Sequence, residues 1–195
     1  AQRRPQQAEP DLWLVFAPIK RARLDFMVEK ATELGVAVLQ PVFTQHTDVS
    51  RVNTERLAAN AREAAEQCER LTVPEVREPV GFQALLEAWP AERHALLCAE
   101  TGAAAPIAEV LADLAGRAGR QAGAETGATP PWAILTGPEG GFHPSELDAL
   151  GKLPFVTPIG LGPRVLRADT AALAALACWQ AWLGDGRERP PFRAE

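Results

Sequence analysis

The chain has 195 residues, of which 47% are hydrophobic and 23% charged, and these values are typical of a soluble globular protein with a sizeable core. Its net charge of −5 argues against a protein coated in nucleic acid, which would need an excess of Lys and Arg to neutralise phosphates. No apolar run is long enough to span a membrane and the polar N-terminus is unlike a signal peptide, so we expect a cytoplasmic protein.

The cysteines and histidines are scattered along the chain. Each of the three cysteines lies in an apolar or helical stretch, which is typical of reduced core thiols rather than of disulfides or a metal cage: Cys68, Cys98 and Cys178. The three histidines form no pair at helical spacing: His46, His94 and His143. The sequence therefore predicts no metal site.

Residues 1–11 are polar, contain two prolines and show no apolar period, so the sequence predicts a linker there. The chain begins at Ala1 and its only methionine is Met27, which indicates that an upstream segment precedes this sequence. The remainder, residues 12–195, is short for two domains and is expected to form one α/β domain.

Apolar runs and helical periods alternate from Leu12 onward. The runs predict buried strands at residues 12–16, 38–43, 95–99, 132–136 and 155–159. The periods predict helices at residues 24–34, 81–88, 107–114 and 170–183, with further helices that start near Asn53 or Thr54 and at Pro144. Repeated β-α units predict a mostly parallel sheet with helices on both faces.

Residues 116–131 differ from the rest of the chain. They contain four glycines, four alanines, two prolines and no large aliphatic side chain. Such a composition cannot support a core, so the sequence predicts a mobile loop within the domain.

The last predicted helix is apolar almost all round. A helix with so little polar surface must be buried inside the domain or against another molecule. A homodimer is therefore one hypothesis, and a central core helix is the alternative.

Two glycine-rich turns each follow a short apolar run, at residues 137–142 and 160–167. Because the carboxyl ends of parallel strands meet at one edge of a sheet, we expect both turns to line one ligand site. Because glycine has no side chain, a ligand can approach the main chain closely. Such a pocket would recognise the shape and the hydrogen-bonding edge of a flat group such as adenine. No Lys follows Gly141 and no dinucleotide fingerprint follows Phe16, so nucleotide phosphates are not expected. The alternative is a pair of ordinary tight turns.

Four ordered motifs lie at residues 30–36, at 63–70 with Pro74, at 137–142 and at 161–171. Together they resemble the RsmE-type 16S ribosomal RNA uridine N3-methyltransferases of the SPOUT superfamily. The resemblance covers almost everything from Leu12 onward. The chain departs from that family at Ala168 and Asp169, where Thr and Glu are usual.

The resemblance implies a SPOUT-type α/β fold whose C-terminal part forms a deep trefoil knot. Periodicity alone could not show a knot, because knots are nearly absent from proteins. The resemblance also implies S-adenosylmethionine bound in the knot loops and a small N-terminal PUA-like β-barrel. That barrel is missing from the sequence, and residues 1–11 would be the linker that follows it.

The resemblance also points to site residues. It implies cofactor contacts by nine of them: Gly137, Glu139, Gly140, Gly141, Ile159, Gly160, Leu161, Gly162 and Leu166. Arg167 is the first catalytic candidate and Arg164 the second, because a cation near uracil O2 or O4 would stabilise the charge that develops when N3 loses its proton. The alternative for Arg167 is a structural pairing with Glu139 or Asp169. Candidate RNA contacts are Lys20, Arg21, Gln67 and Arg70.

The implied activity is the S-adenosylmethionine-dependent methylation of N3 of a uridine in 16S ribosomal RNA, either free or in the small ribosomal subunit. One alternative is a SPOUT methyltransferase acting on another RNA, such as transfer RNA ribose. Another is a noncatalytic assembly factor, although the net negative charge of the chain argues against stand-alone RNA binding. A serine hydrolase is excluded, because neither Ser50 nor Ser145 lies in a nucleophile-elbow turn.

Overall fold

The computed structural model of the chain describes residues 9–99, 104–121 and 130–188. Its strands are β1 (Leu12–Phe16), β2 (Val38–Phe43), β3 (Glu75–Val76), β4 (Val80–Gly81), β5 (His94–Cys98), β6 (Ala105–Pro106), β7 (Trp132–Thr136) and β8 (Val156–Gly160). Its helices are α1 (Arg21–Glu33), α2 (Thr54–Gln67), α3 (Phe82–Glu87), α4 (Ile107–Gln121), α5 (Pro144–Gly151) and α6 (Ala168–Trp182). Every strand and helix predicted above is present. The two-residue strands β3, β4 and β6 are additional, because two residues show no period.

The strands form one sheet in the order β3-β2-β1-β7-β5-β8-β6, with β4 paired to β2. Every strand pair among the described residues is parallel. In the centre, Leu14 of β1 pairs with Ile134 of β7, which pairs with Leu96 of β5. The predicted parallel sheet is confirmed, and the carboxyl ends of its strands meet at one edge.

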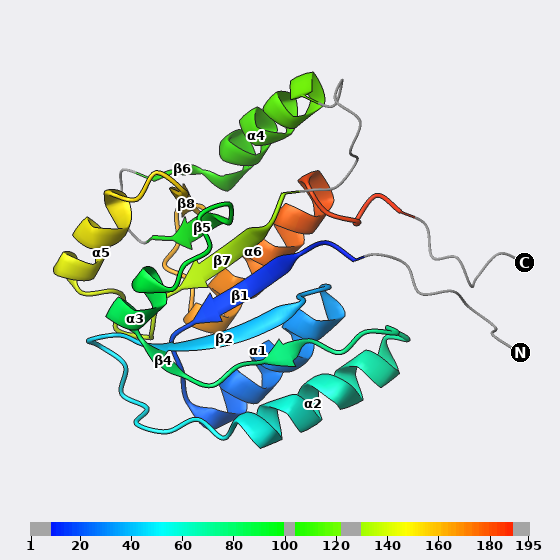
Figure 1. Cartoon of the computed structure of the whole chain (residues 1–195), viewed down its shortest axis with the longest axis vertical. Coiled ribbons are helices and arrows are strands. Elements are labelled where there is room, and N and C mark those ends of the chain that lie inside the picture. The colour runs from blue at the N-terminus through cyan, green and yellow to red at the C-terminus, as the bar shows by residue number, and fades with distance from the viewer. Residues whose placement is uncertain (1–8, 100–103, 122–129, 189–195) are drawn as a thin grey trace, which may run out of the picture.

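Side chains of β1 alternate between the two faces of the sheet. Leu12, Leu14 and Phe16 belong to a core shared with α1, α4 and α6, whereas Trp13 and Val15 belong to a second core shared with α3 and α5. In Figure 1, α1 and α6 lie behind the sheet and the shorter α3 lies in front of it. Helices therefore cover both faces, as predicted.

Local signals set the ends of α1 and α2. Gly35 follows α1 with a φ of +79°, a conformation that favours glycine, and the helix ends where the sequence predicts. The Asn53 side chain caps α2 by accepting a hydrogen bond from the Arg56 N–H at 2.9 Å. Arg56 and Asn60 of α2 also donate to the Asp25 carboxylate of α1. The two helices are thereby joined near their N-terminal ends.

The apolar helix α6 is a core helix along one face. Ala172, Ala175, Leu176 and Trp179 are fully buried and pack in the same core as β1 and α1. Trp182 near the helix end is 40% exposed. No helix among the described residues, α6 included, is both long and apolar enough to cross a membrane. One face of α6 therefore belongs to the core, and the other keeps a part-exposed apolar surface.

Helix α4 extends into the glycine-rich stretch. It continues past Leu114 to Gln121, so the prediction of a loop from residue 116 is wrong for the first turns of that stretch. The two glycines cost about 1 kcal/mol each, and an exposed ion pair between Asp113 and Arg117 at 2.6 Å offsets only a part of this. Residues 122–129 of the predicted loop lie outside the described residues.

Arg70 holds the chain just before it enters β1. Its guanidinium donates to the Glu9 carboxylate and to the Thr32 carbonyl oxygen at the end of α1. The Arg70 side chain is only 10% exposed as a result. Glu9 is thus fixed to the domain, although it belongs to the predicted linker, whose first eight residues lie outside the described part of the chain.

Arg93 joins three segments at the amino edge of the sheet, so an Arg93→Ala variant is expected to lose about 2–3 kcal/mol of stability. The guanidinium donates to the Asp11 carboxylate at 2.7 Å and to the Trp132 carbonyl oxygen at 2.9 Å. It also lies over the Trp13 ring, 3.7 Å from its centroid. Truncation would leave the buried carbonyl without this donor, and urea unfolding would measure the loss.

Arg77→Ala is the matched control for Arg93→Ala. Arg77 also lies over the Trp13 ring, at 4.1 Å, but its side chain is 33% exposed and it pairs with an exposed glutamate. Its removal should cost less than about 1 kcal/mol. Equal losses for the two variants would show that stacking on Trp13, rather than the buried hydrogen bonds, carries the effect.

Candidate active site

A cavity of about 670 Å³ opens at the carboxyl edge of the sheet. A volume of this size suits a ligand of several hundred daltons. The segments that follow β5, β7 and β8 meet around it, together with the start of α6. Its lining includes all nine predicted cofactor contacts and both predicted catalytic residues: Gly137, Glu139, Gly140, Gly141, Ile159, Gly160, Leu161, Gly162, Leu166, Arg164 and Arg167.

The turn after β7 presents main chain to this cavity. Its Gly141 N–H donates to the Pro138 carbonyl oxygen at 2.9 Å and closes the turn, and Gly141 has a φ of +71°. At Gly137, an added Cβ would lie 2.9 Å from the Phe142 ring, closer than real Cβ contacts allow. Phe142 itself is buried in the second core. The turn therefore folds tightly only because Gly137 has no side chain.

The turn after β8 uses its glycines in two ways. A Cβ added to Gly160 would lie 3.2 Å from the Ala104 carbonyl oxygen, so this glycine allows close approach of the segment before β6. Gly162 has a φ of +100° and an added Cβ would meet nothing within 4 Å. The structure brings both glycine turns to one cavity, as the parallel sheet predicts.

Two exposed arginines stand at this cavity. Arg164 and Arg167 both line it, and neither has an ionic partner in the part of the chain that the structure describes. Asp169, which is 7% exposed, instead accepts a hydrogen bond from Arg23 of α1 at 3.2 Å. Arg167 is therefore available to a ligand, and its structural pairing with Asp169 is not observed.

One wall of the cavity was not identified from the sequence. Cys98, Ala99 and Ala104 line it from the end of β5 and from the segment before β6. Burial raises the pKa of the Cys98 thiol to about 12, so the thiol stays protonated at neutral pH and is a poor nucleophile. The available signal was that Cys98 lies near the carboxyl end of the strand predicted at 95–99, at the sheet edge where the glycine turns were also expected.

The predicted RNA contacts on α1 lie on the cavity side of the molecule. Lys20 and Arg21 are exposed where α1 begins. The ion pair between Arg23 of α1 and Asp169 of α6 ties this end of α1 to the start of α6, which itself lines the cavity. Basic residues at the N-terminal end of α1 and just before α6 therefore lie on the same side of the molecule.

The predicted RNA contacts on α2 lie elsewhere. Gln67 and Arg70 are at the C-terminal end of α2, and Arg70 binds Glu9 at the entry to β1. Figure 1 shows this entry at the opposite edge of the sheet from the ends of β7 and β8, whose turns line the cavity. Neither Gln67 nor Arg70 lines the cavity, and the Arg70 guanidinium instead holds the chain at the entry to β1.

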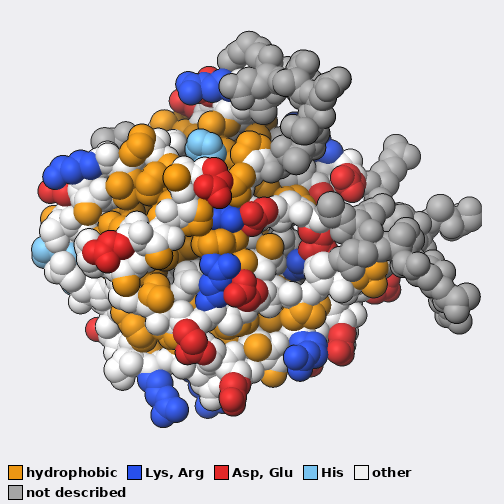
Figure 2. Space-filling model, viewed as in Figure 1, with side chains coloured by type: hydrophobic (Ala, Val, Ile, Leu, Met, Phe, Trp, Pro, Cys, Tyr) orange, Lys and Arg blue, Asp and Glu red, His pale blue; other side chains and the backbone are white. Residues whose placement is uncertain are grey.

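No cluster of three or more His, Cys, Asp or Glu side chains suited to a metal ion occurs in the described ranges. His46 and His143 do lie together, with ring centroids 5.5 Å apart, but each Nδ1 already has a protein partner. Figure 2 shows positive and negative side chains interspersed with hydrophobic ones on the viewed face. That face presents no broad region of a single charge.

Comparison with known proteins identifies relatives over most of the chain. The RNA methyltransferase domain matches residues 6–180. The chain is 32% identical over 171 residues to the ribosomal RNA small subunit methyltransferase E of Rickettsia conorii and 34% identical over 169 residues to that of Synechocystis. These matches cover 85% and 84% of this chain but 62% and 51% of the relatives. The chain thus spans about one half to three fifths of their length.

Solved structures show the same fold. A ribosomal RNA small subunit methyltransferase E from Neisseria gonorrhoeae, bound to S-adenosyl methionine, matches with a TM-score of 0.74 and 27% identity over 91% of this chain and 69% of its own. A putative methyltransferase from Legionella pneumophila, in complex with the bound cofactor SAM, matches with a TM-score of 0.70 and 28% identity over 89% of this chain and 66% of its own. The chain therefore belongs to the family of RNA methyltransferase domains, and its resemblance to the ribosomal RNA small subunit methyltransferases E is confirmed.

Proposed function

We propose that this domain carries out the S-adenosylmethionine-dependent methylation of N3 of a uridine in 16S ribosomal RNA. The observation that carries the proposal is the cavity at the carboxyl edge of the sheet, where two glycine turns and two unpaired arginines meet. The family to which the chain belongs, and its similarity to solved methyltransferases with bound S-adenosylmethionine, support the same function.

The cavity suits a cofactor that is held mainly by main chain. Added Cβ atoms at Gly141 and Gly162 would meet nothing within 4 Å, so open space adjoins the backbone of both turns. In this proposal, the main chain around Ile159, Gly160 and Leu161, with Gly162 and Leu166, holds the adenine. Gly137, Glu139, Gly140 and Gly141 line the ribose and methionine side of the same cavity.

Bound S-adenosylmethionine would supply a sulfonium methyl group. Its transfer to uracil N3 would form the N–CH3 bond as the S–CH3 bond breaks, with S-adenosylhomocysteine leaving as a neutral thioether and the N3 proton passing to solvent. The residues of this chain then have two tasks. The turns hold the reactants in line, and such positioning is worth roughly 7–11 kcal/mol in favourable model systems. Arg167, with Arg164 beside it, stabilises the negative charge that spreads to uracil O2 and O4 as N3 loses its proton.

RNA approaches from the side of α1 in this proposal. Lys20, Arg21 and the two arginines of the cavity provide cations on one side of the molecule, which suits a phosphate backbone. The partner is 16S ribosomal RNA or the small ribosomal subunit, which places the protein in the cytoplasm.

We also propose that residues 12–195 form a SPOUT domain with a C-terminal trefoil knot, and that residues 1–11 are the linker after a PUA-like domain. After β8 at one side of the sheet, the chain returns as α6 to pack on α1 and β7, a path compatible with a knot. The part-exposed apolar surface of α6 is proposed to pack against a second copy. A monomer at micromolar concentration in sedimentation would reject the dimer.

Calorimetry and product analysis test the proposed function. The chain should bind S-adenosylmethionine, and incubation with unmodified small subunits should yield N3-methyluridine on nucleoside digestion. A ribose-methylated nucleoside in transfer RNA would instead indicate the other RNA substrate. Cofactor binding without methyl transfer to any of these RNAs, even in a chain extended at its N-terminus by a PUA-like domain, would indicate the noncatalytic assembly factor.

A further inference from the structure

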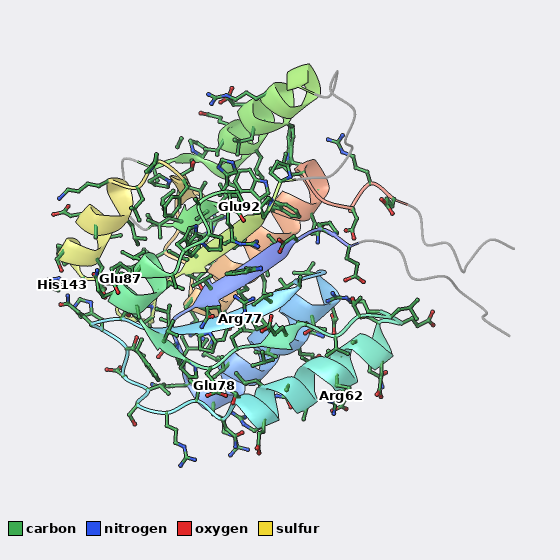
Figure 3. The ribbon with its side chains drawn as sticks, in the orientation of Figure 1. Arg62, Arg77, Glu78, Glu87, Glu92 and His143 are labelled. Carbon is green, nitrogen blue, oxygen red and sulfur yellow. The ribbon has the colours of Figure 1, made fainter. Side chains whose placement is uncertain are left out.

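The turn that follows β2 packs against the glycine turn that follows β7. Thr44 and Thr47 close the first turn through their hydroxyl groups, which are 2.8 Å apart. Figure 1 shows the segment after β2 and helix α5 at the same outer edge of the molecule, and Figure 3 places His143 there, where α5 begins. The two turns are far apart in sequence, so their contact is formed only by the fold.

A single buried carboxylate joins the two turns. Glu146 is 3% exposed, and its two oxygens accept hydrogen bonds from the Gln45 N–H and from the His143 N–H, both at 2.9 Å. β2 and β7 lie on either side of β1 in the sheet. The carboxylate therefore spans the end of β1 and fixes the start of α5 relative to the turn after β2.

His46 contacts the glycine turn directly. Its Nδ1 lies 3.2 Å from the Gly141 carbonyl oxygen. Because a carbonyl oxygen can only accept, Nδ1 must be the donor in this contact. The His46 Cβ would also lie 3.4 Å from a Cβ added to Gly140. His46 therefore contacts the turn at residues 137–142 from the segment after β2, while the Phe142 ring packs against Gly137 within the turn.

We propose that His46 and Glu146 are positioning residues that keep the turn at residues 137–142 in the shape that receives the cofactor. Neither residue lines the cavity, so each would act through the main chain that does. A turn already held in its binding shape loses less conformational entropy when the ligand arrives. This inference rests on the proposed function, because it names the ligand of the same cavity.

His46→Ala is the informative variant, because His46 is exposed and its loss should leave folding intact. S-adenosylmethionine should bind about tenfold more weakly by calorimetry, the equivalent of one lost hydrogen bond. The midpoint of thermal unfolding should stay within about 2 °C of the wild type. His46→Asn keeps a side-chain N–H donor and should recover most of the affinity. His94→Ala, the same change at the opposite edge of the sheet, should bind as the wild type does.

Hydrogen exchange in the absence of cofactor provides an independent readout. The Gly141 amide closes the turn, so it should exchange faster in His46→Ala than in the wild type or in His94→Ala. Unchanged exchange together with unchanged affinity in His46→Ala would overturn the inference. A wild-type chain that binds no S-adenosylmethionine would overturn the proposed function instead, while faster Gly141 exchange would still support the role of His46 in holding the turn.

Discussion

An Arg167→Ala variant is expected to bind S-adenosylmethionine as the wild type does but to transfer methyl groups about 100-fold more slowly, or worse. Arg167 lines the cavity, is exposed, and has no ionic partner among the described residues. Its guanidinium would therefore meet the charge that develops on the uracil rather than a protein carboxylate. Removing one such preorganised donor typically costs a factor of about 10²–10³ in rate.

The measurement is a single-turnover methyl-transfer assay, with calorimetry of cofactor binding alongside it. Arg62→Ala on the exposed face of α2 is the matched control and should leave both quantities unchanged. Arg164→Ala should have a smaller effect on the rate than Arg167→Ala. Wild-type turnover in Arg167→Ala would remove its catalytic role, and loss of cofactor affinity would reassign it to binding.

Gly137→Ala is expected to weaken S-adenosylmethionine binding by tenfold or more, because a change in the lining that costs one main-chain hydrogen bond to the ligand has about that effect. The added Cβ would lie 2.9 and 3.0 Å from two ring atoms of Phe142. Phe142 is 9% exposed and packs in a core cluster, but it also lines the cavity, so the ring can yield only toward the cavity. Either a displaced ring or a shifted turn then changes the cavity lining. Calorimetry measures the loss.

Two further variants separate this effect from a general loss of stability. Gly81→Ala is the matched control, because a Cβ there would meet nothing within 4 Å, and it should bind the cofactor normally. The double variant Gly137→Ala with Phe142→Ala removes the ring and should recover part of the lost affinity. Normal binding by Gly137→Ala alone would contradict the packing argument.

The layout of the fold could be predicted because its signals are local. Apolar runs as short as that at 12–16 favour buried strands over helices, and repeated β-α units leave few arrangements other than a parallel sheet. Parallel strands then bring the ends of β7 and β8 to one edge, so the two glycine turns could be placed together. The knot has no such local signal, and it stays a prediction.

The surroundings of the turns could not be predicted, because they depend on long-range contacts. Glu146 suits the start of a helix from sequence alone, yet its partner Gln45 is 101 residues away. Arg70 is on the polar face of α2 in a helical projection, but folding places its guanidinium against Glu9. Nothing in the local pattern distinguishes such a structural arginine from Arg167, which has no ionic partner within the described ranges.

A crystal structure of this chain with S-adenosylmethionine would show whether the cavity between the two glycine turns is the cofactor site. We expect the adenine beside the main chain around Gly160 and Leu161, with the sulfonium methyl facing the side of the cavity where Arg167 stands. Cofactor located elsewhere on the molecule, with the cavity between the two glycine turns closed or empty, would contradict it.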